Sequence, residues 1–212
     1  MFVITADQRA STVSGERVEE LLTALTPWSQ QWREAIALPL ERTVGDEVQI
    51  VLTAADAAVD LALRLMREGD WSVGIGVGRA HLPLGPSSRA SSGPVFIHAR
   101  DAVERARGRG ESVPLVVTGA DLAAAAEATA ILQLLGAVVR RRSEAGWQVA
   151  DALAGGATRR EAARALGISP QAVSQRAAVA MLDEEAAARP LAARLVTDAG
   201  RESDPSGTVP SS

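Results

Sequence analysis

The stretch "RTVGDEVQIVLT" at residues 42–53 decides the fold of the first half of this 212-residue chain. Gly45 and Asp46 separate two runs rich in apolar and β-branched residues, and both residue types tolerate the backbone dihedrals of tight turns. The pattern predicts two antiparallel strands with these two residues at the turn. For function, the question is whether the acidic residues there only turn the chain or also bind a metal ion.

Strands and helices alternate on both sides of this hairpin. The opening run "MFVITA" predicts a buried strand, and the amphipathic segment after the hairpin predicts a helix that ends at Gly69. The order β-α-β-β-α-β, followed by one more helix and strand, is the split βαβ arrangement of ferredoxin-like folds. We therefore expect an α+β fold with a ferredoxin-like domain over residues 1–119. The expected elements are residues 1–6, 16–37, 40–53, 54–69, 71–80, 96–110 and 113–119.

Three glycines, at positions 74, 76 and 78, alternate inside the expected strand at residues 71–80. They do not open a helix, which argues against a dinucleotide-binding fingerprint. Glycine inside a strand often marks a place where another part of the backbone approaches closely. We therefore expect a helix or loop to pack tightly against this strand.

From about residue 120 onward the sequence predicts continuous helix. An apolar stripe in residues 121–142 could pack on the first domain or against a second copy of the chain, and the sequence leaves both possibilities open. We assign residues 120–198 to an all-α domain. Residues 199–212 are rich in Ser, Pro and Gly, so we expect a disordered tail. The stripe consists of Leu122, Ile131, Leu134, Leu135, Val138 and Val139.

The most specific pattern in the chain is "TRREAARALGISPQAVSQRAAVAML" at residues 158–182. Thr158 followed by Glu161 forms a capping box, and Gly167 supplies a tight turn. Ser169 caps a second helix that has Pro at its first position, where a missing N–H costs nothing. The spacing predicts a DNA-binding helix-turn-helix. The alternative is an ordinary helical hairpin in an alanine-rich protein.

The second of these helices is the expected recognition helix. Its first turns should meet base edges in the major groove, where a Gln side chain can pair bidentately with adenine. Arginines near the helix ends are suited to phosphates, although solvated surface arginines are an equally ordinary interpretation. The arrangement resembles the helix-turn-helix modules of LuxR-type and sigma-factor-type proteins, and we expect Trp147 to anchor its core. The candidate base-reading residues are Gln171, Ser174 and Gln175, and the candidate phosphate-binding residues are Arg159, Arg160, Ser169 and Arg176.

Composition and charge limit the other possibilities. The net charge of -4 gives no global attraction to nucleic acid, so DNA contacts must come from local basic patches such as residues 140–142 and 158–160. Cysteine is absent, which excludes thiol nucleophiles and cysteine-ligated zinc. The N-terminus lacks the basic region of a signal peptide, and we expect no apolar run long enough to cross a membrane. The expected location is the cytoplasm.

Two carboxylates are expected to converge at one edge of the sheet. If the first strand lies beside the hairpin, Asp7 at its end lies close to Asp46 at the turn. Mg²⁺ and Mn²⁺ prefer oxygen ligands and usually combine one or two carboxylates with substrate phosphates. Asp7 and Asp46 are therefore candidate metal ligands, with a nucleotide as the accompanying ligand. A purely structural acidic turn is the alternative.

Four segments of the first 110 residues resemble the SatD family of bacterial proteins. They are "TADQRAS" after the first strand, "GDEVQ" on the hairpin, "GIGVG" in the next strand and "GPVFIHARDAVERAR" leading into a helix. The resemblance covers roughly residues 1–180, because SatD-like proteins also end in a helix-turn-helix. The same segments are similar, more distantly, to the palm domain of class III nucleotidyl cyclases and diguanylate cyclases. This similarity implies metal binding at Asp7 and Asp46.

The chain departs from the cyclase pattern in the residues that perform the chemistry. The asparagine and arginine that stabilise the cyclase transition state have no clear counterpart, because Asp101, Glu104 and Arg105 occupy that helix in a different order. The lysine that selects the purine is not evident either. We therefore expect a DNA-binding transcriptional regulator, acting as a homodimer, with the palm-like domain as sensor or oligomerisation unit. The alternative is a metal-dependent nucleotide-binding protein or a cyclase-like enzyme.

Overall fold

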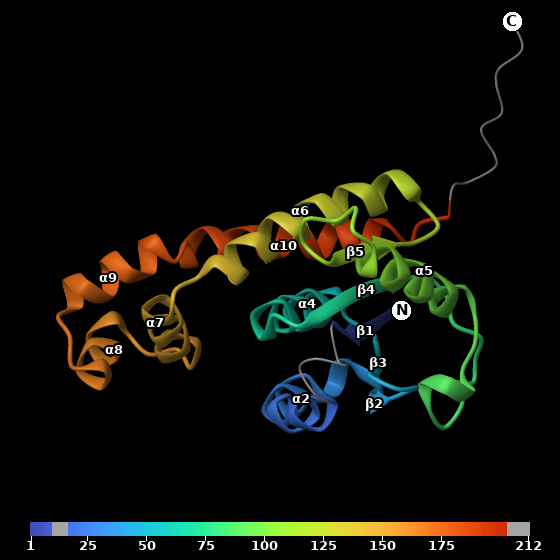
Figure 1. The fold of residues 1–212 in the computed structure, drawn as a ribbon, viewed down its shortest axis with the longest axis horizontal. Coiled ribbons are helices and arrows are strands. Elements are labelled where there is room, and N and C mark those ends of the chain that lie inside the picture. Colours follow the sequence, from blue (N-terminus) through green and yellow to red (C-terminus); the bar gives the residue numbers. More distant parts are fainter. Residues whose placement is uncertain (10–16, 203–212) are drawn as a thin grey trace, which may run out of the picture.

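The computed structural model describes residues 1–9 and 17–202. Their fold is mixed α+β, built on a five-stranded sheet with the order β2-β3-β1-β4-β5 (Figure 1). The pairings among the first four strands are antiparallel, and β5 runs parallel to β4. The strands are β1 (Phe2–Gln8), β2 (Ile36–Arg42), β3 (Glu47–Leu52), β4 (Trp71–Val77) and β5 (Leu115–Thr118).

The predicted hairpin is confirmed. β2 and β3 pair antiparallel, and Gly45 between them has a φ of 64°, a left-handed conformation that glycine adopts without steric cost. β3 also pairs with β1, which brings Asp7 opposite Glu47. The end of the first strand and the hairpin turn therefore do meet at one edge of the sheet.

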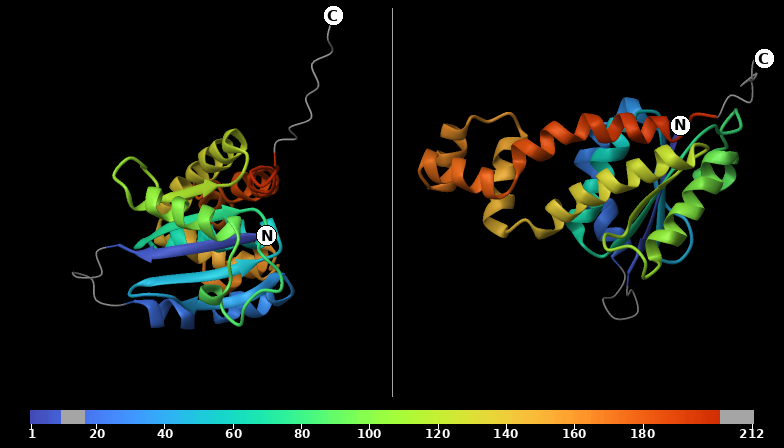
Figure 2. Two further views of the ribbon diagram at one scale, coloured as in Figure 1. Left: turned by 90° about the vertical axis from the view of Figure 1, so that its right-hand side faces the viewer. Right: turned by 90° about the horizontal axis from the view of Figure 1, so that it is seen from above.

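Helices cover both faces of the sheet. Ile4 and Ile50 point to the face that holds the main core, whereas Val3 and Val51 point to the opposite face and pack with α5. Figure 2 shows α5 alone on its side of the sheet. The helices of the main-core face are α2 (Val18–Ala24), α3 (Thr26–Gln31), α4 (Ala55–Glu68), α6 (Leu122–Arg141) and α10 (Leu182–Asp198); α5 is Pro94–Arg107, and short 3-10 helices are Arg33–Ala35 and Ser88–Ala90.

The expected helix over residues 16–37 is wrong in its extent. The chain forms two short helices, α2 and α3, and a 3-10 turn before β2 begins at Ile36. Pro27 lies in the first turn of α3, where its missing N–H is tolerated. Proline would disrupt the interior of a longer helix, so the helical pattern divides there.

The close approach expected at the strand glycines is confirmed at two of them. A Cβ on Gly74 would lie 2.2 Å from the backbone nitrogen of Val103, and one on Gly76 would lie 2.3 Å from that of Ala99. Both neighbours belong to α5. The backbone of this helix therefore rests directly on β4.

Helix α6 packs on the first domain. Its buried residues join the main core, and the Thr129 Oγ1 atom accepts a 3.0 Å hydrogen bond from the Val117 nitrogen of β5. The core thus continues past residue 119, where the sequence predicted a domain boundary. We expected no apolar run long enough to cross a membrane, and this expectation was wrong in length and composition. Residues 122–141 form a 20-residue helix whose mean hydropathy reaches 1.8. Seven of its residues are buried in the core.

Helix α10 runs back beside α6 and covers the same face of the core. Ala199, just past its end, is fully buried, and its carbonyl oxygen accepts a 3.0 Å hydrogen bond from the Asp121 nitrogen. The tail expected from residue 199 therefore begins with packed residues. The rest of that expectation, from residue 203 on, lies outside the described residues.

Candidate nucleic-acid interface and the acidic strand end

Between α6 and α10 the chain forms a separate group of three helices. They are α7 (Glu144–Ala154), α8 (Arg159–Leu166) and α9 (Pro170–Val179). Their small core is built by Val149, Ala162, Ala163, Val173 and Ala177. Figure 1 shows the group projecting beyond the ends of α6 and α10, away from the sheet. This placement leaves α8 and α9 open to a large partner.

The local signals at the start of α8 and α9 are confirmed. The Thr158 Oγ1 atom accepts a hydrogen bond from the Glu161 nitrogen, and the Glu161 carboxylate accepts one of 2.8 Å from the Thr158 nitrogen. The Thr158 nitrogen and hydroxyl both donate to this carboxylate, and these two bonds lower the pKa of the Glu161 carboxyl. Gly167 follows α8 with a φ of 66°, and Ser169 Oγ accepts from the Ala172 nitrogen to cap α9. The two helices are therefore joined by a short, well-defined turn.

The candidate base-reading residues differ in their solvent exposure and in their hydrogen bonds within the protein. Gln171 and Gln175 lie one helical turn apart on α9, and both side chains are exposed. Ser174 is half-buried: its hydroxyl donates to the Pro170 carbonyl oxygen at 3.1 Å and accepts from Arg159 at 3.4 Å. The two glutamines are thus the side chains of α9 best placed to reach outward.

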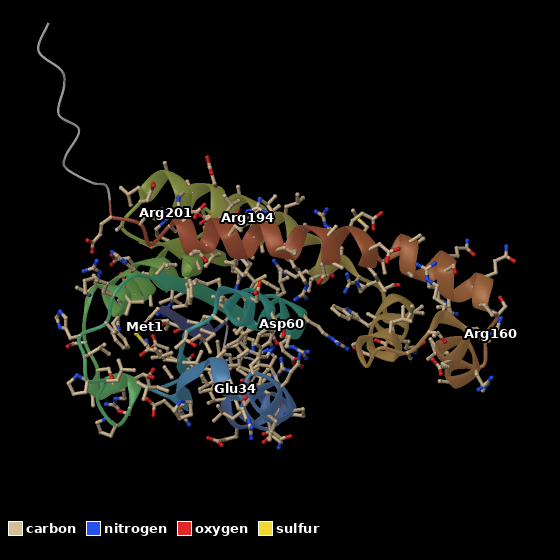
Figure 3. All side chains as sticks on the ribbon, turned by 180° about the vertical axis from the view of Figure 1, so that it is seen from behind. Met1, Glu34, Asp60, Arg160, Arg194 and Arg201 are labelled. Atoms are coloured by element: carbon tan, nitrogen blue, oxygen red, sulfur yellow. The ribbon has the colours of Figure 1, made fainter. Side chains whose placement is uncertain are left out.

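The candidate phosphate-binding residues surround this face. Arg159 is exposed and forms a 3.1 Å ion pair with Asp183, whose side chain is also exposed. Arg160 is exposed and Arg176 half-buried, and neither forms an ion pair within the described part of the chain. Figure 3 shows Arg160 at the outer end of the helical group. Arg164, which the sequence pattern did not single out, is also exposed on α8 and lies four residues after Arg160 in the same motif.

The basic patch expected at residues 140–142 is wrong for Arg142. Its side chain is only 2% exposed, and its guanidinium pairs with the buried carboxylate of Glu185. It also donates to the Ala180 carbonyl oxygen at 3.0 Å. Arg142 therefore fixes the junction of α6 with α10 and is not available to a phosphate.

Trp147 of α7 lies at the same junction and not in the core of the helical group, where it was expected. Its ring packs against the main core, with the guanidinium carbon of Arg67 at 3.9 Å and that of Arg142 at 4.4 Å from its centroid. Arg67 also forms a bidentate pair with Asp151 of α7, at 2.6 and 2.7 Å. These contacts join α4 of the sheet domain to α7. The same side chains line one side of a cleft of about 460 Å³ between α4, α7 and α10.

The end of β1 and the hairpin turn, which carry the two acidic candidates, lie next to each other. Asp7 is buried, and the Gln8 nitrogen next to it donates to the Asp46 carbonyl oxygen at 3.2 Å. Burial raises the pKa of the Asp7 carboxyl; the Arg107 guanidinium opposes this shift, and the carboxylates of Asp46 and Glu47 add to it. The edge is therefore a place where negative charge is crowded.

Asp7 has a partner that no sequence pattern indicated. The Arg107 Nε atom, at the end of α5, lies 3.3 Å from the Asp7 carboxylate. A guanidinium thus occupies one side of the carboxylate that a metal ion would need. Within residues 1–9 and 17–202 no three His, Asp or Glu side chains are grouped to hold a metal ion.

Comparisons with known proteins gave no match to a family model, to a curated protein or to a solved structure.

Proposed function

We propose that the chain is a cytoplasmic, sequence-specific DNA-binding protein that regulates transcription through α8 and α9. One observation supports this most directly. The exposed face of α9, with Gln171 and Gln175, begins after a capped turn and projects away from the sheet. Its geometry is that of a helix free to enter the major groove with its first turns.

The side chains around α9 have distinct roles in this proposal. Gln171 and Gln175 pair with base edges, where a glutamine amide can both donate to and accept from adenine. Arg160 and Arg176 bind phosphates and position the helix without reading sequence. Arg159 can join them, because an exposed ion pair such as that with Asp183 contributes little stability and is readily exchanged for a phosphate.

The sheet domain is proposed to be a ferredoxin-like, palm-like unit of the SatD type. The support is the strand order β2-β3-β1-β4 with antiparallel neighbours, which the split βαβ arrangement requires. Metal-dependent nucleotide binding at Asp7 and Asp46 stays a prediction from the sequence. The ion pair of Asp7 with Arg107 gives this alternative no added support.

Binding to the DNA upstream of the chain's own coding region, compared with an unrelated fragment at two salt concentrations, tests the proposal. We expect the double variant Gln171→Ala, Gln175→Ala to lose its preference for the specific fragment while keeping salt-sensitive binding to both. Each lost bidentate contact should cost about 1–3 kcal/mol of discrimination. Arg160→Ala should instead weaken binding to both fragments and reduce the salt dependence.

The matched control is Gln148→Ala, because Gln148 is an exposed glutamine of α7, outside the proposed contact helices. It should bind like the unchanged protein. If a protein that prefers one fragment keeps that preference after both α9 glutamines are replaced, base readout by α9 is wrong. Equal, salt-sensitive binding to every fragment of a random DNA library would overturn the proposed function as a whole.

A further inference from the structure

The outer face of α6 exposes apolar side chains at the surface of the sheet domain. α6 and α10 form the outermost layer above the sheet, and Figure 2 shows no other element over them. Leu134, in the middle of α6, is 62% exposed, although most large apolar side chains of this chain are buried. Val179 and Met181, at the junction of α9 and α10, are 78% and 43% exposed.

Five of the exposed residues of α6 form one straight stripe. They recur at spacings of three, four or seven residues, which places them on one side of a helix. An acidic residue precedes Leu134 by seven positions and a basic residue follows it by seven, so each lies about 10 Å along the axis from Leu134. The stripe consists of the exposed residues Ala123, Glu127, Ala130, Leu134 and Arg141, with the half-buried Ala137 and Val138 at its edges.

Neither charge on this stripe is used inside the molecule. Glu127 and Arg141 are both exposed, and neither forms an ion pair with another residue of the described chain. Reversing the direction of such a helix exchanges the positions of its acidic and basic ends. The stripe is therefore complementary to an antiparallel copy of itself.

We propose that a second copy of this chain binds along α6, antiparallel, with a twofold axis passing beside Leu134. The two Leu134 side chains then meet at the axis, and Ala130 lies opposite the partner's Val138. Glu127 lies beside the partner's Arg141 on both sides of the axis, as a twofold interface requires. Alanine at the neighbouring stripe positions lets the two helix backbones approach closely.

Charge and burial favour this occupant over the others. A parallel copy would place Glu127 beside the partner's Glu127 and arginine beside arginine, which is unfavourable. A lipid bilayer would have to accept the two charges, while the opposite face of α6 stays in the protein core. A second copy satisfies both the leucine and the charges.

The size of the surface sets the expected affinity. The stripe from Ala123 to Arg141 is about 27 Å long. Next to it lies a shallow hollow of about 270 Å³ lined by Leu134, Val138, Val179 and Met181, which extends the apolar contact. A single helix pair is smaller than a standard interface of about 1,600 Å², so we expect a reversible dimer of micromolar affinity.

Sedimentation equilibrium of the full chain without DNA tests this proposal, independently of the proposed function. We expect a monomer–dimer equilibrium that Leu134→Glu abolishes and that Glu127→Arg or Arg141→Glu alone weakens about tenfold or more. The double variant Glu127→Arg, Arg141→Glu restores the opposite charges across the axis and should recover the dimer. This recovery distinguishes a direct contact from a folding defect, and far-ultraviolet circular dichroism checks the fold of each variant.

Leu82→Glu is the matched control, because Leu82 is 76% exposed in the loop between β4 and α5. It should dimerise like the unchanged chain. A monomer at all concentrations up to about 1 mM would overturn the proposal. So would a dimer that Leu134→Glu leaves intact, or a double charge variant that dimerises no better than the single ones.

Discussion

Asp7 shows how a single residue can work against the stability of the fold. Its carboxyl is buried at the end of β1, and this burial raises its pKa despite the nearby Arg107 guanidinium. The folded protein therefore holds the proton more tightly than the unfolded chain does. The favourable contribution is complete below the ordinary Asp pKa of about 3.9 and is lost as the pH rises through the raised folded value. At neutral pH the charged Asp7 lowers the free energy of unfolding.

We expect Asp7→Asn to raise the melting temperature at pH 7, because the amide removes the buried charge. The gain should disappear near pH 3, where the carboxyl of the unchanged protein is also neutral. Arg107→Ala should lower the melting temperature at pH 7 by removing the opposing positive charge. Scanning calorimetry across this pH range measures both effects.

Asp101→Asn serves as the control for this experiment, because Asp101 is exposed on α5 and should leave the pH dependence unchanged. The opposite result would be a lower melting temperature for Asp7→Asn than for the unchanged protein at pH 7, with a smaller difference at pH 3. It would mean that the ion pair with Arg107 outweighs the burial of the carboxyl.

At the scale of elements, the contact between β4 and α5 depends on two missing side chains. A Cβ on Gly76 would lie 2.3 Å from both the Ala99 nitrogen and the Val95 carbonyl oxygen. These are backbone atoms of one helix, so neither can move without the whole of α5. The close packing of α5 on the sheet therefore depends on glycine at this position.

Gly76→Ala should consequently reduce the free energy of unfolding by about 3 kcal/mol or more, as expected for overpacking against backbone. Urea unfolding followed by circular dichroism measures this loss. Gly110→Ala is the matched control, because no atom lies within 4 Å of a Cβ there. It should change the free energy of unfolding by no more than about 0.5 kcal/mol. Equal stability of the two variants would show that α5 can shift freely on β4.

The sequence predicted those features that neighbouring residues determine. The hairpin at Gly45, the end of α4 at Gly69 and the capping box of Thr158 depend on residues a few positions apart, and all three are confirmed. The pairing of Asp7 with Arg107 and the burial of Arg142 connect residues far apart in the chain. No local pattern encodes such contacts, because they arise only when α5, α6 and α10 pack.

At the scale of the whole molecule, buried charges hold the adjoining ends of α6 and α10 to α4 of the sheet domain. Glu185, at the start of α10, accepts hydrogen bonds from Arg142 of the α6 end and, at 2.7 Å, from Arg189. Arg189 in turn pairs with Asp60 of α4 at 2.6 Å. This chain of ion pairs connects three helices at the point where α7–α9 leave the body.

We expect Glu185→Ala to reduce the free energy of unfolding by about 3–5 kcal/mol, because it leaves the buried guanidinium of Arg142 without a carboxylate. Asp183→Ala is a close control. Asp183 lies in the same first turn of α10, but its side chain, which pairs with Arg159, is 81% exposed. Its replacement should cost less than about 1 kcal/mol. Chemical unfolding of the two variants compares them, and similar losses would show that the buried pair contributes no more than a surface one.

The antiparallel arrangement of α6 and α10 also affects how such a protein can evolve. The chain leaves the body after Arg142 and returns at Ala180, and an Arg142 nitrogen and the Ala180 carbonyl oxygen are 3.0 Å apart. Residues 143–179 therefore form an insertion whose two ends meet. Because a short connection can close such a gap at little entropic cost, the insertion can be exchanged for another group of helices or removed. The sheet with α6 and α10 would then serve as a common frame for different inserted segments.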